Sequence, residues 1–178
     1  MENSVAPMEA VASTEAPQLH SLHDKWTLWA HLPHDTDWTV KSYKEILTFD
    51  SVEQAITLCE TLPEQMIKNC MLFLMREGIK PTWEDEKNRR GGCFSYKVSN
   101  KSVTGAWKNL SYTLVGEVLT QDERLRPTIN GITISPKKNF CIIKIWLATC
   151  ECQNPAMIAQ DSGLSSHGCL FKKHVPEY

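Results

Sequence analysis

The stretch Pro81-Thr82-Trp83-Glu84-Asp85-Glu86-Lys87-Asn88-Arg89-Arg90-Gly91-Gly92 combines an aromatic ring, alternating charges and a glycine pair. Pro81 and the glycines are typical of a loop that leads into a strand. Trp83 is unusual there, because a large apolar ring seldom stands in so charged a run without something to cover it. Two interpretations stay open from this stretch alone. One is a solvated turn whose Trp83 folds back onto the core, and the other is an aromatic face beside the Glu84 carboxylate that receives a flat cationic ligand.

The bulk composition predicts one soluble domain. The chain has 178 residues, of which 42% are hydrophobic and 22% are charged, and this suits a single domain with its own core. The formal net charge of -2 excludes a basic field over the whole molecule, so any contact with nucleic acid must be local. No apolar run approaches the roughly 18 residues of a membrane span, and the start of the chain lacks a signal-peptide pattern. We therefore expect no membrane contact.

The cysteines and tryptophans carry further information. An odd count of 7 cysteines predicts reduced thiols and a cytoplasmic location, with the nucleus as a second compartment. Cys150 and Cys152 are too close for ordinary zinc spacing, and no Cys-x-x-Cys or histidine pair completes a site, so we expect no metal. The 6 tryptophans exceed what packing requires in a domain of this size. This surplus favours an aromatic binding cleft.

Hydrophobic patterning predicts how the chain is organised. Residues 1–19 are poor in large apolar side chains and predict a disordered tail, followed by a single domain over 20–178. Helices are predicted after Ser51, which has Gln54 at the capping-box position, and between 102 and 119. A short helix is expected over 156–160. Strands are predicted at 24–31, 43–49, 70–75, 93–99, 128–135 and 140–149. Too few helices separate these strands for a parallel sheet, so we expect a largely antiparallel sheet with one covered and one open face.

The residues of this sequence favour ligand binding over catalysis. No phosphate loop, zinc-protease helix or Gly-x-Ser-x-Gly elbow is present, so an enzyme is not expected. Trp38 and Trp83 each stand in a loop at a strand end, and two rings about 7 Å apart can sandwich a planar base, each stack contributing about 1–3 kcal/mol. Glu84 can accept two parallel N–H bonds from one edge of that base. Guanine offers such an edge at N1 and N2, and methylation at N7 adds a charge that aromatic faces attract.

Several motifs resemble the eukaryotic mRNA cap-binding translation initiation factor 4E family. They are Trp26-Thr-Leu-Trp29, Phe49-Asp50-Ser-Val52-Glu53, the 81–92 stretch, Leu114-Val-Gly116-Glu117 and Ile143-x-Ile145-Trp146. The match is nearly colinear over about residues 20–151. It implies an α+β fold, in which helices pack on the convex face of a curved, largely antiparallel β-sheet and the concave face is open to ligand. It also implies no cofactor, and as ligand the 7-methylguanosine cap of mRNA, as m7GTP, a cap dinucleotide or capped mRNA.

The resemblance assigns roles position by position. Trp38 and Trp83 match the two stacking tryptophans. Glu84 matches the carboxylate that reads the N1 and N2 edge, and Trp146 matches the tryptophan that touches the N7-methyl group. Trp107 matches a buried tryptophan of the family, in agreement with its place on the apolar face of the predicted helix.

The phosphate site departs from the family pattern. Lys137 stands at one basic position of the family, whereas two others hold Cys93 and Ile142. Because alternate residues of a strand share a face, Lys144 would face the cleft together with the tryptophan two positions later. We hypothesise that Lys137 and Lys144, helped by Lys138, contact the cap phosphates. The alternative is that Lys144 is an ordinary solvated lysine of the sheet.

The expected partner surface on the convex face departs further. In the family this patch binds a large scaffold initiation factor and repressors that mimic it, through an amphipathic helix. Ile56 replaces the anchoring tryptophan of the patch, and Lys108-Asn109 replaces Leu-Glu, so such docking is weakened or re-specified here. The positions that make up this altered surface are His20, Val52, Ile56, Lys108, Asn109, Tyr112 and Gly116.

Cap binding in translation initiation is the leading function. The alternative is a cap-binding translational repressor or decoy that does not recruit the usual scaffold factor. An enzyme acting on the cap is disfavoured, because no nucleophile or metal-binding acidic cluster is recognisable. A pure protein-interaction module is disfavoured by the intact Trp38, Trp83 and Glu84.

Overall fold

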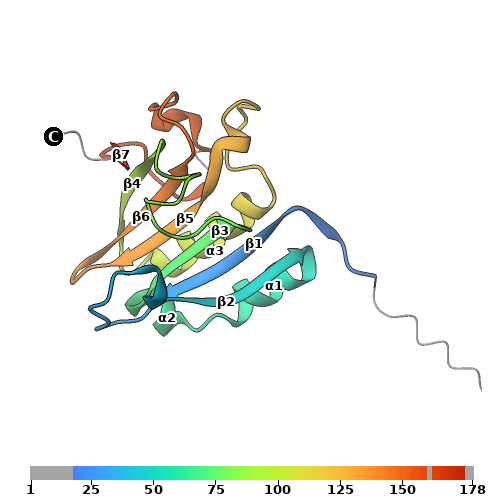
Figure 1. Ribbon diagram of the computed structural model, residues 1–178, viewed down its shortest axis with the longest axis vertical. Coiled ribbons are helices and arrows are strands. Elements are labelled where there is room, and N and C mark those ends of the chain that lie inside the picture. The colour runs from blue at the N-terminus through green and yellow to red at the C-terminus, as the bar shows by residue number, and fades with distance from the viewer. Residues whose placement is uncertain (1–17, 160–161, 175–178) are drawn as a thin grey trace, which may run out of the picture.

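The computed structural model describes residues 18–159 and 162–174. Their strands form one sheet in the order β2-β1-β3-β5-β6-β4-β7, and every neighbouring pair is antiparallel. The strands are β1 (Ser21–His31), β2 (Tyr43–Ser51), β3 (Met71–Arg76), β4 (Gly92–Ser99), β5 (Ile129–Pro136), β6 (Phe140–Leu147) and β7 (Leu170–Lys173). The helices are α1 (Val52–Thr61), α2 (Glu64–Asn69) and α3 (Val103–Val115), labelled in Figure 1. The predicted tail over 1–19 lies almost wholly outside the described residues.

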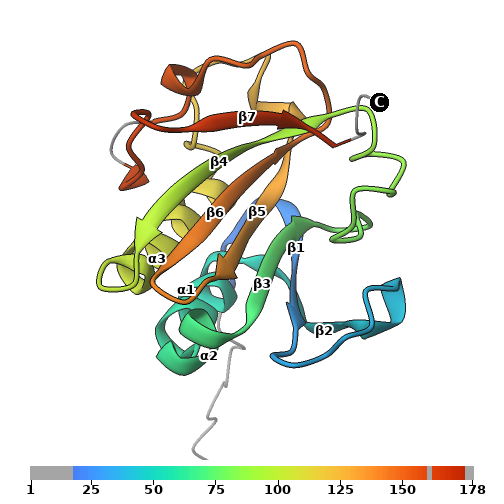
Figure 2. The ribbon, with the colours of Figure 1, turned by 90° about the vertical axis from the view of Figure 1, so that its left-hand side faces the viewer.

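The three α-helices lie on one side of the sheet. Figure 2 looks onto the other side, with the strands in front and α1, α2 and α3 behind them. The α+β fold class is therefore confirmed, with helices on the convex face of a curved antiparallel sheet and an open concave face. Among the described residues, no helix has both the length and the apolar character needed to cross a bilayer.

The start of α1 follows its sequence signal. The Ser51 hydroxyl accepts a hydrogen bond from the Gln54 backbone N–H at 3.3 Å, and the Gln54 side-chain oxygen accepts one from the Asp50 N–H at 3.2 Å. The first bond satisfies a backbone donor that the first turn of a helix leaves unpaired, and the second ties the Gln54 side chain back to the residue before the cap. The predicted capping of α1 is confirmed.

Three short elements differ from the sequence expectation. α2 and β7 were not predicted, and the helix expected over 156–160 is a 3₁₀ turn, Pro155–Met157. Each is too short to show hydrophobic periodicity. β7 has four residues, and its antiparallel pairing with β4, more than 70 positions earlier in the chain, defines it as a strand.

The sheet carries hydrophobic clusters on both faces. The main core fills the space between the sheet and the helices, and it contains Trp26 and the predicted buried Trp107. A smaller cluster on the open face contains Phe73, Met75, Ile79 and Trp146, with Trp29, Tyr43 and Met71 packed against it. An open face with an aromatic floor is suited to an apolar ligand.

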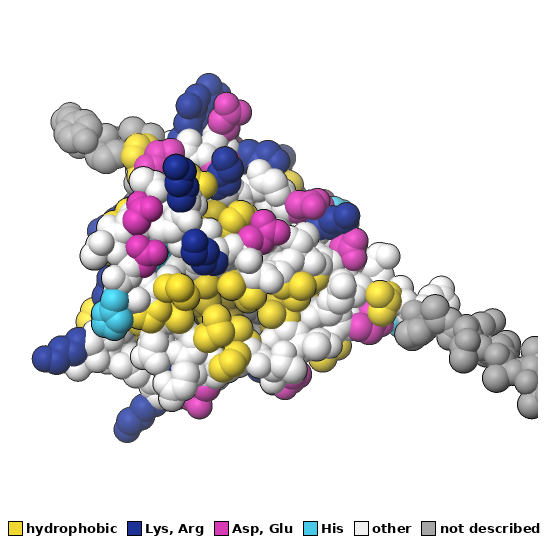
Figure 3. Space-filling view, turned by 60° about the horizontal axis from the view of Figure 1, so that its bottom comes forward, with side chains coloured by type: hydrophobic (Ala, Val, Ile, Leu, Met, Phe, Trp, Pro, Cys, Tyr) yellow, Lys and Arg dark blue, Asp and Glu magenta, His cyan; other side chains and the backbone are white. Residues whose placement is uncertain are grey.

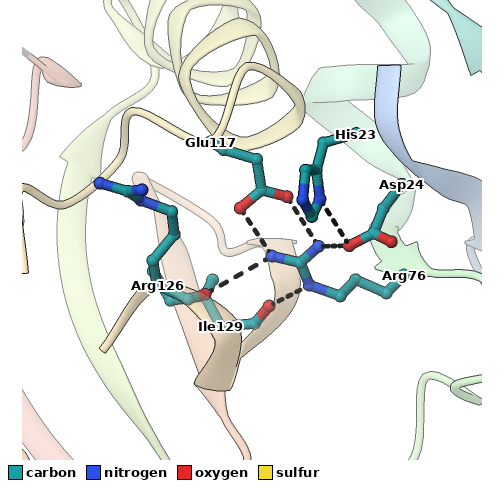
Figure 4. A network of polar contacts seen from close by, with 6 residues as sticks. All are labelled: His23, Asp24, Arg76, Glu117, Arg126 and Ile129. Atoms are coloured by element: carbon teal, nitrogen blue, oxygen red, sulfur yellow. Dashed lines mark hydrogen bonds and ion pairs between the residues drawn. The ribbon is translucent and has the colours of Figure 1, made fainter. Parts of the chain in front are cut away.

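A part-buried ion-pair network fastens one end of the sheet (Figure 4). The Arg76 guanidinium donates to the Glu117 carboxylate at 2.7 and 2.9 Å, to the Ile129 carbonyl at 2.8 Å and to Asp24. It also lies 4.7 Å from the ring centroid of Trp26. The bonds join β1, β3, the turn after α3 and the start of β5.

The same network contains three groups with the spacing of metal ligands. Ligand atoms of His23, Asp24 and Glu117 lie within 4.8 Å of one another. Both carboxylates, however, are turned toward the Arg76 guanidinium and bonded to it (Figure 4). We therefore assign the cluster a structural role.

Candidate functional site

The loop between β3 and β4 is built around a buried amide. Asn88 has no exposed surface, and its side-chain NH₂ donates to the carbonyls of Lys80 at 3.0 Å and Thr82 at 2.8 Å. Its side-chain oxygen accepts from Asn130 of β5 at 2.9 Å. Asp85 adds bonds to backbone N–H groups on both sides of the turn, from Lys80 and Lys87. The loop is thus held by its own side chains.

This clamped loop presents Trp83 and Glu84 to solvent. Trp83 is 44% exposed, and Glu84 is exposed as well. A folded-back Trp83 on the core, one of the two interpretations of the sequence, is therefore not what the structure has. An exposed ring on an ordered loop is available as a stacking surface.

Trp38 stands on the loop that follows β1. Its ring is 59% exposed and stacks on His31, with centroids 4.2 Å apart and planes 5° apart. The His31 Nε2–H donates to the Asp37 carbonyl at 2.9 Å, which fixes the imidazole. Hydrogen bonds from the Thr39 backbone and hydroxyl hold the pKa of Asp37 below its usual value. One face of Trp38 is thus backed by His31, and the ring stays open to solvent elsewhere.

Tyr43 connects the two loops. Its ring meets His31 edge-on at 5.3 Å and Phe73 of the floor at 5.3 Å. Burial raises the pKa of Tyr43, and the negative charge of Glu84 raises it further. In Figure 2 the loop after β1 and the loop before β4 both lie on the right-hand side of the view, the first below and the second above. Ring contacts thus link Trp38 to the floor of the open face through His31 and Tyr43.

Trp146 lies in the floor of the open face. It is 7% exposed, and its ring N–H donates to the Thr133 hydroxyl at 2.7 Å. The His174 imidazole lies against it, with centroids 4.7 Å apart. His174 was not predicted as a site residue, because its partners are 28 or more positions away in the chain. The role of Trp146 toward a methyl group stays a prediction.

His174 also ties the C-terminal strand to the clamped loop. Its Nδ1–H donates to the Asn88 carbonyl at 2.7 Å, and its backbone N–H donates to the Gly91 carbonyl at 3.0 Å. Its Nε2 is buried without a hydrogen-bond partner. Burial lowers the pKa of His174, and the nearby positive charge of Lys144 lowers it further.

Two of the three predicted phosphate-binding lysines line a common hollow on the open face. Lys137 and Lys144 both border a hollow of about 460 Å³, and Ile142 lies between them in its wall. Strand alternation predicted that Lys144 faces this side, and the structure places it there. Lys138, in contrast, is an exposed residue of the turn and does not line the hollow. Cys93 is buried beside Trp146, its partner across the strands.

The predicted partner surface gathers on α1, α3 and the residues before β1. Val52 and Ile56 are exposed on α1. The Lys108 ammonium lies 2.5 Å from a Glu60 carboxylate oxygen, which also accepts from the Tyr112 hydroxyl at 2.9 Å. These bonds lower the pKa of Glu60, and burial, followed by the bond to Glu60, raises the pKa of Tyr112 to about 12. The charge of Lys108 is therefore partly neutralised within the chain.

The edges of this surface are formed by the chain entering β1 and leaving α3. His20 donates from its backbone N–H to Glu53 at 3.0 Å, and its ring Nδ1 lies 2.6 Å from the same carboxylate. The bond from the His20 ring lowers the pKa of Glu53. Asn109 is half-buried and Gly116 is exposed at the end of α3.

A separate group of apolar side chains lies near the edge strand β2. Ile46 and Leu47 of that strand are exposed, as are Leu32 and Val40 in the segment before it. Figure 3 shows the molecule from below, where hydrophobic side chains form a band bordered by charged ones. No contact in the described residues identifies a ligand for this band.

The family model described as Eukaryotic initiation factor 4E matches residues 21–162. Among curated proteins, the chain is 32% identical over 159 residues to Eukaryotic translation initiation factor 4E of Eremothecium gossypii, covering 86% of this chain and 70% of that protein. It is 29% identical over 142 residues to the Candida albicans protein of the same name, covering 74% and 66%. The chain thus spans about two thirds of the length of these relatives.

The solved structures of similar fold are also described as eIF4E proteins. A complex of C. elegans eIF4E-3 with the 4E-binding protein Mextli and cap analog has a TM-score of 0.67 and 26% identity, over 74% of this chain and 76% of that one. Ascaris suum eIF4E-3 with m7G cap has a TM-score of 0.67 and 24% identity, over 75% and 76%. Schistosome eIF4E complexed with m7GpppG and 4E-BP has a TM-score of 0.67 and 23% identity, over 75% and 74%, a likeness of fold.

Proposed function

Because the chain belongs to the eukaryotic initiation factor 4E family, we propose that it binds the 7-methylguanosine 5′ cap of mRNA and acts in translation initiation. The C. elegans protein of similar fold holds a cap analog, and the Ascaris suum protein holds an m7G cap. In this proposal the protein binds the cap without chemistry on it, and needs no cofactor. Its site of action is the cytoplasm, with the nucleus as a second compartment, which imaging of a tagged chain would test.

The observation that carries the proposal is the exposed Trp83–Glu84 pair on a clamped loop, together with a second exposed tryptophan, Trp38, that His31 and Tyr43 link to the floor of the open face. In the proposed mode the methylated base enters between the two tryptophans, and His31 supports Trp38 from behind. Each stack contributes about 1–3 kcal/mol, and the positive base adds up to about 2 kcal/mol of cation–π attraction where water is excluded. The loop is ordered before the ligand arrives, so less ordering entropy is lost on binding.

The remaining groups read the ligand's edge and charge. Glu84 accepts the N1–H and N2–H bonds of guanine, a charge-assisted pair that fixes the orientation of the base. Trp146 contacts the N7-methyl group from the floor. Lys137 and Lys144, with Lys138 at the turn, bind the phosphates. The methyl-dependent positive charge of the base is what separates this ligand from ordinary GTP.

A pair of matched variants tests the edge reader. Glu84→Gln should weaken m7GTP binding by at least about 1.5 kcal/mol, or roughly tenfold, because a charged acceptor becomes a neutral amide. Glu86→Gln changes the same charge in the same loop, on another exposed side chain, and should leave affinity within twofold. Both are measured by tryptophan-fluorescence titration. Equal affinities of the two variants would remove Glu84 from the site.

Wild-type protein gives the test of the function itself. It should be retained on immobilised 7-methylguanosine triphosphate and released by free m7GTP at concentrations where GTP releases none. Equal release by the two nucleotides would sink the proposal, because the stacking mode requires the methylated, positive base.

The altered convex surface favours a second candidate, a cap-binding repressor or decoy. Lys108 and Tyr112 are engaged with Glu60, and Ile56 offers less contact area than an aromatic anchor. Both features weaken docking of an amphipathic helix. A binding assay with a peptide from the usual scaffold factor distinguishes the candidates: micromolar or tighter binding favours the initiation factor. No binding, with gain of binding in Ile56→Trp/Lys108→Leu, favours the repressor.

A further inference from the structure

A titratable side chain lies directly behind the exposed ring of Trp38. The imidazole of His31, at the end of β1, and the indole of Trp38 are nearly parallel, with ring centroids 4.2 Å apart and planes 5° apart. His31 is 3% exposed, whereas Trp38 is 59% exposed. One face of the indole is thus covered by a buried imidazole, while the ring stays open to solvent elsewhere.

Contacts from three segments hold this imidazole in place. Its Nε2–H donates to the Asp37 carbonyl at 2.9 Å. Tyr43, opposite His31 in β2, meets its ring edge-on at 5.3 Å, and Met71 of β3 stands opposite it on the other side of β1. Since Nε2 carries the donated proton, Nδ1 is the nitrogen that takes up or releases a second one. The charge state of the imidazole therefore acts on Trp38 at stacking distance.

The charged and titratable groups on these segments are engaged elsewhere or uncharged. The Asp37 carboxylate accepts from the Thr39 backbone N–H at 2.8 Å and from its hydroxyl at 3.0 Å, so His31 is bonded to the neutral carbonyl of Asp37 instead. Burial raises the pKa of Tyr43, which leaves the phenol uncharged at neutral pH. Lys44 stands opposite the residue before His31 and so points to the other face of the strands. Histidine is the side chain that gains and loses its charge in the physiological range.

The charge of the imidazole decides what the indole offers to a cationic base. A neutral imidazole leaves the negative π face of Trp38 to attract a positive ring. A protonated imidazole is itself a cation against that indole. It would lie about 8 Å from a cationic base on the opposite face, which is the observed 4.2 Å plus about 3.5–4 Å of ring contact. Two like charges at that distance repel each other, and the ring between them excludes the water that would screen them.

Resting on the proposed function, we propose that His31 is a positioning residue that sets the charge selectivity of the base site through Trp38. In its neutral form it supports the indole and lets it attract the methylated base. In its protonated form it opposes the same base, so protonation of His31 and binding of the cap weaken each other. Cap affinity then falls on acidification for a reason that lies in this protein and not in the ligand.

The test measures m7GTP affinity of the full chain at pH 7.5 and pH 5.5 by calorimetric titration, in wild type, His31→Phe and His31→Gln. Phe keeps an aromatic ring behind Trp38, Gln keeps an N–H donor for the Asp37 carbonyl, and neither titrates. Between the two pH values wild type should lose about tenfold more affinity than His31→Phe, as expected for like charges about 8 Å apart in a partly desolvated site. His31→Gln should bind more weakly than His31→Phe at both values, because the stacked ring is gone, and should show the same small dependence on pH. A purely structural role of His31 would instead lower the affinity of each variant by one factor at both values.

A matched control removes a neighbouring imidazole. His34 is exposed on the same loop and has a φ of 69°, which Asn tolerates, so His34→Asn should keep the pH dependence of wild type within twofold. Titration of the ligand and of His174 is common to all four proteins and cancels in the comparison.

Three outcomes would count against these proposals. Equal pH dependence in wild type and His31→Phe would overturn the inference and leave the proposed function standing. Loss of m7GTP binding at pH 7.5 in both His31 variants would also overturn it, because an uncharged side chain behind Trp38 would then not suffice. Failure of wild type to bind m7GTP at pH 7.5 would overturn the proposed function, and the inference with it.

Discussion

Single buried polar side chains decide the geometry of the open face. Asn88 uses both ends of its amide, toward the loop that carries Trp83 and toward Asn130 of β5. His174 adds a bond to the carbonyl of the same residue. Leaving such a buried group without its partner costs about 1–3 kcal/mol. The loop conformation therefore depends on residues that do not touch a ligand in the proposed mode.

His174 makes stability depend on pH in a predictable direction. Burial lowers its pKa from the ordinary 6.5, the Lys144 charge lowers it further, and the Asn88 carbonyl opposes both. A histidine whose pKa is lower when folded favours the neutral form, so its contribution is complete above about pH 6.5 and is lost as the pH falls below that value. Urea denaturation at pH 7.5 and pH 5.5 should show a smaller loss of stability in His174→Gln than in wild type. An equal loss in both proteins would contradict this role.

Asn88 and His174 also show which single residues could not be predicted from the sequence. Trp38, Trp83 and Glu84 could be predicted as ligand groups, because an aromatic or a carboxylate in a loop has a chemical meaning by itself; the structure shows them exposed, and their roles stay predictions. Asn88 lay within the quoted stretch but was not singled out, since its importance arises from Asn130, 42 positions away. His174 is 86 positions from Asn88 and had no local pattern around it.

At the scale of elements, long periodic segments were predicted and short ones were not. All six predicted strands are present within a few residues of their predicted bounds, as are α1 and α3, because each repeats its apolar residues over two or more turns or pleats. The helix predicted to run to 119 ends at Val115, and Glu117 beyond it has a φ of 57° and turns toward Arg76. β7 exists through pairing with β4, which no local pattern reports.

The caps of α1 and α3 offer a matched pair of tests. Ser51 accepts a hydrogen bond at the start of α1, whereas Ser102, at the same position of α3, makes no such capping bond. Ser51→Ala should lower the free energy of unfolding by about 1 kcal/mol, and Ser102→Ala by clearly less. Urea denaturation of the two variants measures the difference. Equal losses would mean that the Ser51 cap adds nothing beyond ordinary serine contacts.

At the scale of the whole molecule, the family resemblance read from the sequence is confirmed by the match over residues 21–162 and by the shared fold. The motifs were sufficient to predict the family because they follow one another along this chain in the order that the family shows. Of the lysines that line the hollow on the open face, only two were predicted. Lys137 was predicted from the family resemblance, and Lys144 from the alternation of residues along the strand. Lys97 and Lys172 join them only through the register of β4 with β6 and β7.

The Arg76 network joins β1, β3, the turn after α3 and the start of β5 through one guanidinium. Arg76→Met leaves the Glu117 and Asp24 carboxylates without their guanidinium, and because the network is part-buried the free energy of unfolding should fall by about 1.5–3 kcal/mol, the range for hydrogen bonds to charged groups. Lys25→Met breaks only the exposed pair with Asp50, at 3.7 Å, and should cost less than about 1 kcal/mol. Thermal and urea unfolding of both variants check this. Similar small losses would show that the network is solvated in solution.

The placement of the helices on one face of the sheet has a consequence for how complexes form. A protein docked on α1 and α3 and a nucleic acid lying on the open face would be separated by the whole layer of strands (Figure 2). Neither would block the other sterically, so under the proposed mode a ternary complex can assemble in either order. Any cooperativity between the two would have to pass through the sheet, in which β1, for example, presents Trp26 to the helix side and Trp29 to the ligand side.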